Sequence, residues 1–208
     1  PADIPRDVAS RLRVISRTVY RVLGIRDIAR IDFRLGEDGR IYLLEVNALP
    51  SLERGAGLFA AAAHTGLSFD MAIAAIVKSA ALRWKLATPE QLGATATRRR
   101  SPQVRVGFTY NMKRLEAKSG DDPHAEYDPP ETIAAISDSI ASFGHAVVHL
   151  EATTDLPRVL GEANVDLVFN IAEGLIGRNR EGQVPALCEL LGIPYTGSDS
   201  ATLAVALD

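Results

Sequence analysis

Acidic and amide side chains lie close together in the first quarter of the chain, on both sides of a glycine-rich turn. Asp32 falls in one apolar-rich run, and Glu45 and Asn47 fall in the next, where strand alternation puts both on one face. A four-residue hairpin loop over 37–40 pairs Asp32 with Glu45, and the same register pairs Arg30 with Asn47. Two carboxylates, an amide oxygen and a guanidinium then converge. These ligands suit Mg²⁺ with a bound phosphate, which the arginine is placed to meet.

A solvated hairpin face is the alternative explanation for these polar residues. Glu45, however, stands between Leu44 and Val46, and a carboxylate in an apolar run is costly unless it is paired or metal-bound. The face opposite the polar residues is expected to be apolar and consists of Ile31, Phe33, Ile41, Leu43 and Val46. The hairpin therefore predicts a ligand site backed by a hydrophobic layer.

Helical periodicity predicts the elements that support the hairpin. An amphipathic helix over 5–23 would pack on the hairpin sheet and turn an arginine-rich face to solvent. A short helix over 58–64 precedes a longer one that Ser68 caps. Residues 87–102 lack periodicity and are rich in proline, glycine and threonine, which predicts a linker between segments 1–86 and 103–208.

The second segment alternates predicted strands with predicted helices. The strands are expected over 103–110, 146–150 and 166–170, with a fourth strand or its end at 193–197, and the helices over 131–143, 156–162 and 181–191. This alternation predicts a parallel, Rossmann-like α/β sheet. Ligands bind beyond the carboxyl ends of such strands, where Glu173 and Gly174 follow the third one.

Composition excludes several classes of function. The 208 residues are 47% hydrophobic and 24% charged, which is ordinary for one or two soluble domains. The net charge is −3, so the chain lacks the excess of positive charge that is typical of nucleic-acid-binding proteins. The single cysteine, Cys188, cannot form an internal disulfide, and no apolar run reaches the roughly 18 residues of a membrane span. We expect a cytoplasmic chain that binds neither nucleic acid nor membrane.

The hairpin sequence resembles the end of an ATP-grasp domain, and most of all that of the D-alanine–D-alanine ligase family. The motif runs from Ala29 to Phe33 and from Leu44 to Pro50, and the resemblance covers residues 1–86. It implies ATP and Mg²⁺, with Mn²⁺ as an alternative ion. It also implies that Asp32, Glu45 and Asn47 hold the metal that bridges the ATP phosphates, and that Arg30 stabilises the acyl-phosphate or tetrahedral intermediate.

Segment 103–208 resembles the N-terminal, pre-ATP-grasp domain of the same family, which ordinarily precedes the ATP-grasp domain. The reversed order implies the tail of one ligase unit joined to the head of another, inactive on its own, with the loop 170–174 serving a different site from the hairpin. A circular permutation is the alternative. Glu173-Gly174 replaces the family's His-Gly, so Glu173 could hold a substrate amino group or be an ordinary loop glutamate.

The resemblance also bears on substrates and partners. Ser51 begins the segment that corresponds to the family's acceptor-binding loop. Because it replaces the glycine of the family's Pro-Gly, the resemblance does not identify the acceptor substrate. We expect an ATP-dependent carboxylate–amine ligase for an amino acid or short peptide, with the rest of a tandem ligase, or a second copy in a homodimer, as protein partner. The alternatives are a non-catalytic bridge between two ligase units and an ATP-grasp ligase for other substrates.

Overall fold

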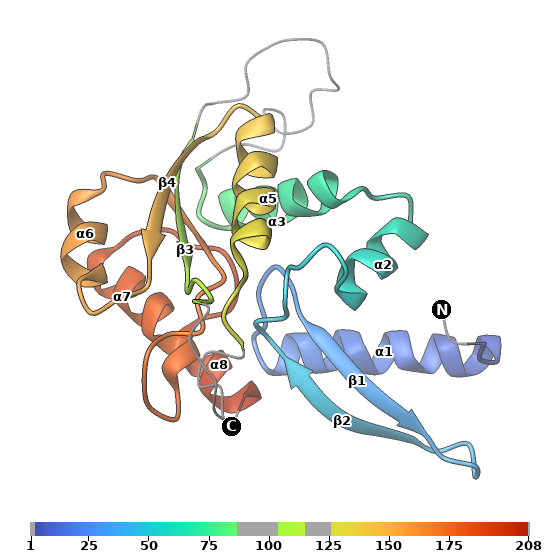
Figure 1. The fold of residues 1–208 in the computed structure, drawn as a ribbon. Helices are drawn as coiled ribbons and strands as arrows, with labels where there is room; N and C mark the ends of the chain where they lie inside the picture. Colours follow the sequence, from blue (N-terminus) through green and yellow to red (C-terminus); the bar gives the residue numbers. More distant parts are fainter. Residues whose placement is uncertain (1–2, 87–103, 115–125, 208) are drawn as a thin grey trace.

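The computed structural model describes residues 3–86, 104–114 and 126–207, so the predicted linker at 87–102 lies outside the described residues. The chain is a mixed α/β structure with one antiparallel and one parallel sheet (Figure 1). In chain order the elements are α1 (Arg6–Val22), β1 (Arg30–Leu35), β2 (Ile41–Asn47), α2 (Gly57–His64), α3 (Phe69–Arg83), β3 (Arg105–Tyr110), α5 (Pro130–Ser142), β4 (Ala146–Glu151), α6 (Leu156–Glu162), β5 (Leu167–Asn170), the 3₁₀ turn η1 (Arg180–Gly182), α7 (Gln183–Leu191) and α8 (Ser200–Ala206).

The hairpin β1–β2 forms both predicted pairs, Asp32 with Glu45 and Arg30 with Asn47. The predicted four-residue loop is wrong by one position, because Leu35 pairs with Ile41 and five residues connect the strands. A β-bulge at Leu44 absorbs the difference, since Asp32 pairs with Glu45 whereas its neighbour Phe33 pairs with Leu43. An extra residue in one strand restores the alternation beyond it. Of the apolar residues expected to back the polar face, Val46 is buried, whereas Leu43 is 46% exposed.

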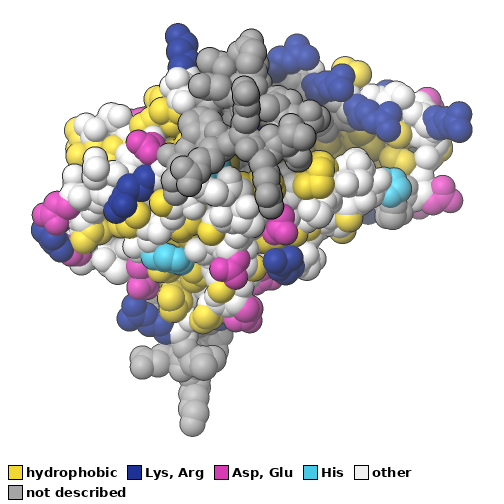
Figure 2. Space-filling view, turned by 90° about the horizontal axis from the view of Figure 1, so that it is seen from above, with side chains coloured by type: hydrophobic (Ala, Val, Ile, Leu, Met, Phe, Trp, Pro, Cys, Tyr) yellow, Lys and Arg dark blue, Asp and Glu magenta, His cyan; other side chains and the backbone are white. Residues whose placement is uncertain are grey.

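Helix α1 runs alongside the hairpin, and Figure 1 shows the two elements extending together away from the parallel sheet. Only Val8 of this helix is buried, whereas its arginines are exposed, as the sequence predicted. In Figure 2, Lys and Arg side chains gather toward the side of the molecule where α1 and α2 lie. The exposed face of α1 is therefore rich in arginine.

The parallel sheet has the order β4-β3-β5, with β3 in the centre. Of the two alternatives predicted for 193–197, a fourth strand or its end, no full strand forms: Tyr195 makes an isolated parallel bridge with Val168, and the backbone then turns toward α8. Helix α8 has no counterpart among the predicted helices, although Asp199 caps it by accepting a hydrogen bond from the Thr202 amide. The sheet thus has three strands and leaves the 195–199 segment free to contact the first part of the chain.

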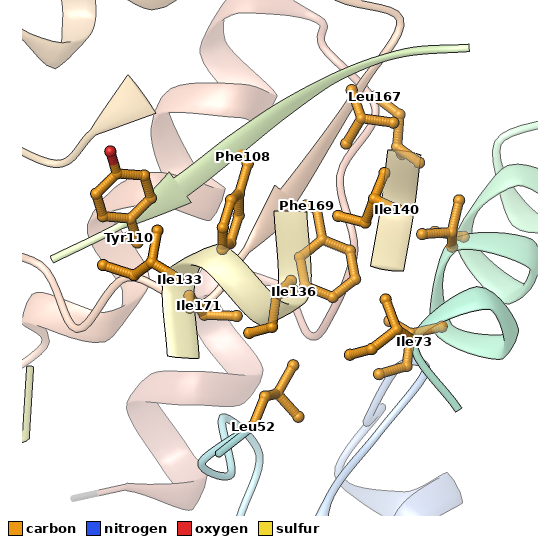
Figure 3. Close-up of a cluster of buried hydrophobic side chains, with 14 of the residues drawn as sticks. Leu52, Ile73, Phe108, Tyr110, Ile133, Ile136, Ile140, Leu167, Phe169 and Ile171 are labelled. Atoms are coloured by element: carbon orange, nitrogen blue, oxygen red, sulfur yellow. The ribbon is translucent and has the colours of Figure 1, made fainter. Parts of the chain in front are cut away.

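One hydrophobic core serves both segments of the chain. Ile73, Ile76 and Val77 of α3 belong to the same buried cluster as Phe108 and Phe169 of the parallel sheet. Helix α5 adds Ile133, Ile136 and Ile140 between them (Figure 3). Burying these apolar side chains is the main force that would hold the segments together.

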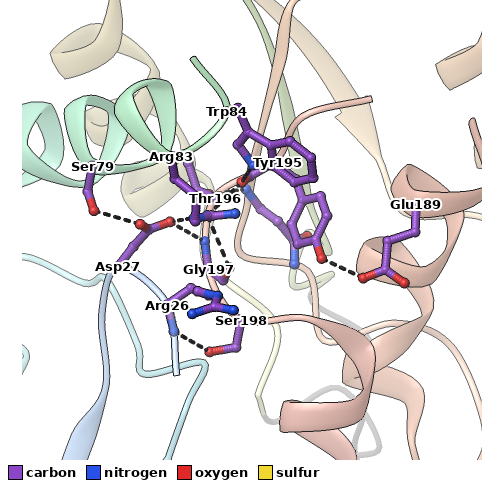
Figure 4. A network of polar contacts seen from close by, with 11 residues as sticks. Arg26, Asp27, Ser79, Arg83, Trp84, Glu189, Tyr195, Thr196, Gly197 and Ser198 are labelled. Atoms are coloured by element: carbon purple, nitrogen blue, oxygen red, sulfur yellow. Dashed lines mark hydrogen bonds and ion pairs between the residues drawn. The ribbon is translucent and has the colours of Figure 1, made fainter. Parts of the chain in front are cut away.

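A polar network reinforces this junction (Figure 4). The Asp27 side chain is 2% exposed, and its carboxylate accepts hydrogen bonds from Ser79 Oγ, from Arg83 and from the Gly197 amide at 2.7, 2.7 and 2.8 Å. Trp84 Nε1 donates to the Tyr195 carbonyl at 2.9 Å. Residues about 110 to 170 positions apart in the chain are therefore fixed against each other.

Within the described residues, no single helix has the length and apolar character needed to cross a membrane. The pair α2 and α3 meets those criteria only when taken together, and it is bent by 97°.

Candidate active site

The polar face of the hairpin brings its charged residues into direct contact. Arg30 Nε lies 3.1 Å from Asp32 Oδ2, and an Arg30 guanidinium nitrogen lies 3.1 Å from Glu45 Oε1. The three side chains are between 40% and 51% exposed. Exposed ion pairs of this kind add little to folding stability, so the cluster is better suited to binding than to holding the fold.

Asn47 and Ser51 continue this surface beyond β2. Asn47 Oδ1 accepts a hydrogen bond from the Leu49 amide at 2.9 Å, and Ser51 Oγ accepts one from the Glu53 amide at 3.3 Å. An amide oxygen has two acceptor positions, so Asn47 keeps one. Two half-exposed carboxylates and this oxygen on one strand face are a donor set that fits Mg²⁺.

A pocket of about 710 Å³ opens beside the hairpin. One wall comes from the first segment and includes Arg30, Glu45, Asn47 and Ser51. The other comes from the second segment and includes Tyr127, Asp128, Glu173 and Glu181. Asp32 is not part of the lining, but it bonds to Arg30, which is. The hairpin and the 170–174 loop, which were expected to serve separate sites, both line this pocket, because the shared core brings the two segments together.

The backbone after β5 is shaped to present Glu173 to this pocket. Gly174 has φ +77°, and a Cβ there would collide with the Arg180 carbonyl group, so only glycine fits. Its amide donates to Asn111 Oδ1 at 3.0 Å, and its carbonyl accepts from Tyr127 Oη at 3.2 Å. Glu173 is thereby held between the end of β5 and the segment that precedes α5.

Asp128 lies on that preceding segment and is only 9% exposed. Its amide donates to the Asn111 carbonyl at 3.0 Å, so Asn111 ties Asp128 and Gly174 to the same point at the end of β3. Two acidic residues from distant parts of the chain are in this way brought to one wall of the pocket.

Arginine side chains neutralise only some of the carboxylates on this acidic wall of the pocket, which consists of Glu126, Asp128, Glu173 and Glu181. Arg180 forms ion pairs with Glu126 and with Glu181, and these two glutamates can bring carboxylate oxygens within 4.8 Å of Glu173. Burial, with a smaller effect of the Glu53 charge, raises the pKa of Asp128 to about 7. Burial, followed by the charges of Glu181 and Asp128, raises the pKa of Glu173 to about 8.

These shifts predict that folding stability falls as the pH rises. Asp128 and Glu173 stay protonated in the folded chain well above the pH of about 4 at which the unfolded chain releases these protons. Their stabilising contribution is therefore complete below a pH of about 4 and is lost as the pH rises through about 7 and about 8. Urea unfolding of the Asp128→Asn variant should show a smaller loss of stability than the parent chain between about pH 5 and about pH 9, a range that brackets both raised pKa values.

Asp138→Asn is the matched control, since Asp138 is an exposed carboxylate on α5. It should retain the pH dependence of the parent. If the unfolding free energy of Asp128→Asn changed with pH as much as that of the parent, this would contradict a buried carboxyl group with a raised pKa at position 128.

Sequence patterns located part of this site. They named Arg30, Asp32, Glu45, Asn47, Ser51, Glu173 and Gly174, of which all but Asp32 and Gly174 line the pocket. They missed Asp128, Glu53 and Glu181, because single carboxylates in polar loops carry no periodic signal. The one available indication was the length of the polar segment between 111 and 130, which is greater than a simple connection needs.

Comparison with known proteins finds relatives of the first segment. Residues 1–78 match the family model described as "D-ala D-ala ligase C-terminus". D-alanine–D-alanine ligase from Acidiphilium cryptum is 39% identical over 84 residues, which are 40% of this chain and 28% of the relative. The vancomycin B-type resistance protein VanB from Enterococcus faecalis is 40% identical over 77 residues, 37% of this chain and 22% of the relative.

A further D-alanine–D-alanine ligase, from Nitratidesulfovibrio vulgaris, is 35% identical over 78 residues, which are 38% of this chain and 26% of the relative. The chain thus spans less than a third of the length of these curated relatives. No solved structure matches the chain.

Proposed function

We propose that the chain carries part of the active site of an ATP-dependent carboxylate–amine ligase, because residues 1–78 match the family model described as "D-ala D-ala ligase C-terminus". The names of the relatives support ligase function. The observation that carries the proposal is the hairpin register, which joins Arg30, Asp32 and Glu45 within the matched segment.

In the proposed reaction, the γ-phosphoryl group of ATP passes to an oxygen of the donor carboxylate, which gives an acyl phosphate and ADP. The acceptor nitrogen then bonds to the acyl carbon, the bond from that carbon to the phosphate oxygen breaks, and the amine loses a proton. Arg30 would stabilise the negative charge that develops on the oxygens during both steps.

Asp32, Glu45 and Asn47 would hold Mg²⁺, with Mn²⁺ as the alternative ion. The bound metal supplies positive charge against the phosphates of ATP. The two carboxylates both bind Arg30, and its contacts at 3.1 Å hold them on one face. The strand thus keeps the donor set assembled.

The proposal extends to the second segment. Residues 103–208 would be a Rossmann-like domain of the pre-ATP-grasp type, and the pocket lining supports a site to which this domain contributes Glu173. The substrates would be amino acids or short peptides, with Ser51 and Gly174 near the acceptor or donor. Residues 1–208 alone would not turn over ATP, and the active unit would be the tandem ligase that contains them.

A structural bridge between two ligase units is the second candidate. The shared core and the Asp27 network support it, since both would join the segments rigidly without any catalytic step. The two functions are compatible, because a rigid junction would also hold the walls of the pocket in place.

The metal assignment can be tested in the longer ligase that would contain this chain. Glu45→Ala and Asn47→Ala should raise the Mg²⁺ concentration needed for ADP release, because each removes an oxygen ligand. Glu37→Ala is the control, since Glu37 is an exposed residue of the hairpin connection outside the pocket lining. An unchanged Mg²⁺ requirement in both site variants would refute the metal assignment.

A further inference from the structure

A second pocket, of about 510 Å³, lies beside the hairpin on the side away from the candidate active site. Ile31 lines this second pocket, whereas Arg30, its neighbour on β1, lines the first. Because side chains alternate along a strand, these two residues point to opposite faces of the hairpin. Among the described residues, none lines both pockets. A ligand of the second pocket would therefore be separate from the ligands of the proposed ligase site.

Helix α1 supplies the polar wall of the second pocket. Arg17 and Arg21 lie about one turn apart on this helix, as do Ser16 and Tyr20, and all four residues line the pocket. Within residues 3–86, 104–114 and 126–207, neither guanidinium forms a hydrogen bond or an ion pair. The Ser16 and Tyr20 hydroxyl groups likewise form no hydrogen bond with a described residue. Two cationic groups and two hydroxyl groups are thus available to a ligand.

The positive charge of this wall has no local counter-charge. Like charges at positions i and i+4 destabilise a helix, so Arg17 and Arg21 repel each other. Asp27 contributes a carboxylate to the lining, but its side chain is 2% exposed and it is already paired with Arg83 at 2.7 Å. An anionic ligand would supply the negative charge that is missing beside the two arginines.

The floor of the second pocket is apolar. It comes from the chain that enters β1, from β1 itself and from the start of α2, and its residues are Ile28, Ala29, Ile31 and Leu58. All four are half-buried, so an aromatic or aliphatic group laid on them would remove apolar surface from water. The volume is within the range of about 300 to 1,000 Å³ that is typical of small-molecule sites. The pocket thus combines a cationic wall with an apolar floor.

We infer that the second pocket binds a phosphate ester with an aromatic or aliphatic body. A phosphate dianion matches the charge of two guanidinium groups, and their planar N–H donors fit phosphate oxygens in pairs. A carboxylate has one negative charge and two oxygens, so it would leave one guanidinium unmatched. The Ser16 and Tyr20 hydroxyl groups donate to the remaining phosphate oxygens, while the body of the ester covers the apolar floor.

Phenyl phosphate is a suitable probe, because it joins a phosphate group to an aromatic ring and is a dianion above its second pKa of about 6. Titration into the 208-residue chain at about pH 7.5, followed by NMR, should shift the backbone amide signals of Tyr20, Ala29 and Ile31 to saturation. Inorganic phosphate lacks the apolar body and phenol lacks the charge, so each should bind about tenfold more weakly or worse. Arg17→Gln and Arg21→Gln should each weaken phenyl phosphate binding about tenfold.

Arg6→Gln is the matched control. Arg6 is an exposed arginine of the same helix, about 16 Å along its axis from Arg17 and outside the pocket lining. The control has the same net charge as the two site variants, and it should bind phenyl phosphate like the parent. Equal weakening in all three variants would overturn the inference, because it would indicate a general attraction of anions to α1.

Equal binding of inorganic phosphate and phenyl phosphate would also overturn the inference, as would the absence of a saturable shift with phenyl phosphate. The titration involves neither ATP nor turnover. Its failure is therefore separate from failure of the proposed function, which the Mg²⁺ requirement of Glu45→Ala and Asn47→Ala tests.

Discussion

Replacing Arg30 by alanine is expected to lower ligase turnover about 10²- to 10³-fold in the longer enzyme that would contain this chain, with little change in folding stability. The guanidinium lines the pocket and contacts both Asp32 and Glu45. Its loss would remove positive charge from the place where phosphoryl oxygens gain negative charge. The fold should persist, since these ion pairs are about half exposed and contribute little to stability.

Arg34→Ala is the matched control for Arg30→Ala. Arg34 lies on the same strand and is exposed, but it does not line the pocket. Arg30→Lys separates charge from geometry, because lysine keeps the charge but cannot bridge two carboxylates with a planar fork. Equal turnover of the Arg30→Ala and Arg34→Ala variants would refute a catalytic role for Arg30.

The largest loss of stability is expected from Asp27→Ala, at about 3 kcal/mol or more. This change would remove an acceptor of three hydrogen bonds and leave the Arg83 guanidinium without its carboxylate and the Gly197 amide without its acceptor. Asp27 also has φ +57°, a conformation that alanine adopts less readily than aspartate or asparagine. Denaturant unfolding followed by the fluorescence of Trp84 measures the loss directly, because this single tryptophan donates to the Tyr195 carbonyl across the junction.

Asp27→Asn should lose less stability than Asp27→Ala, since asparagine keeps an acceptor oxygen and tolerates the left-handed backbone. Asp155→Ala is the surface control. Asp155 pairs with Arg158 in solvent, and its removal should leave the unfolding midpoint unchanged. If Asp27→Ala unfolds at the same denaturant concentration as Asp155→Ala, the junction does not depend on the Asp27 network.

Local signals in the sequence are sufficient to predict the hairpin. Its turn contains Asp38-Gly39, and strand alternation places Glu45 and Asn47 on one face, which the structure reproduces. The bulge at Leu44 could not be predicted. The connection is one residue longer than expected and β2 has one extra residue at Leu44, so the two differences cancel and Asp32 still pairs with Glu45. Helix α3 was likewise predictable, since Ser68 caps it by accepting from the Met71 amide.

The junction and the acidic wall depend on contacts between distant residues. Asp27 meets Gly197 across 170 positions, and nothing in the sequence around either residue indicates the other. Asp128 reaches the pocket because Asn111 binds its backbone amide and also binds Gly174. Such tertiary contacts have no periodic sequence pattern, so sequence reasoning expected the hairpin and the 170–174 loop to serve separate sites, whereas in the structure both line the same pocket.

The most direct test of the shared pocket is a paramagnetic relaxation measurement with a nitroxide attached at Ser51. The label requires Ser51→Cys in a chain whose buried Cys188 is changed to serine. If both segments line one pocket, the amide signals of Tyr127, Asp128 and Glu173 should broaden together with those of residues 45–53. Broadening confined to the hairpin and its neighbours, with the signals of the second segment unaffected, would contradict a single site built from both segments.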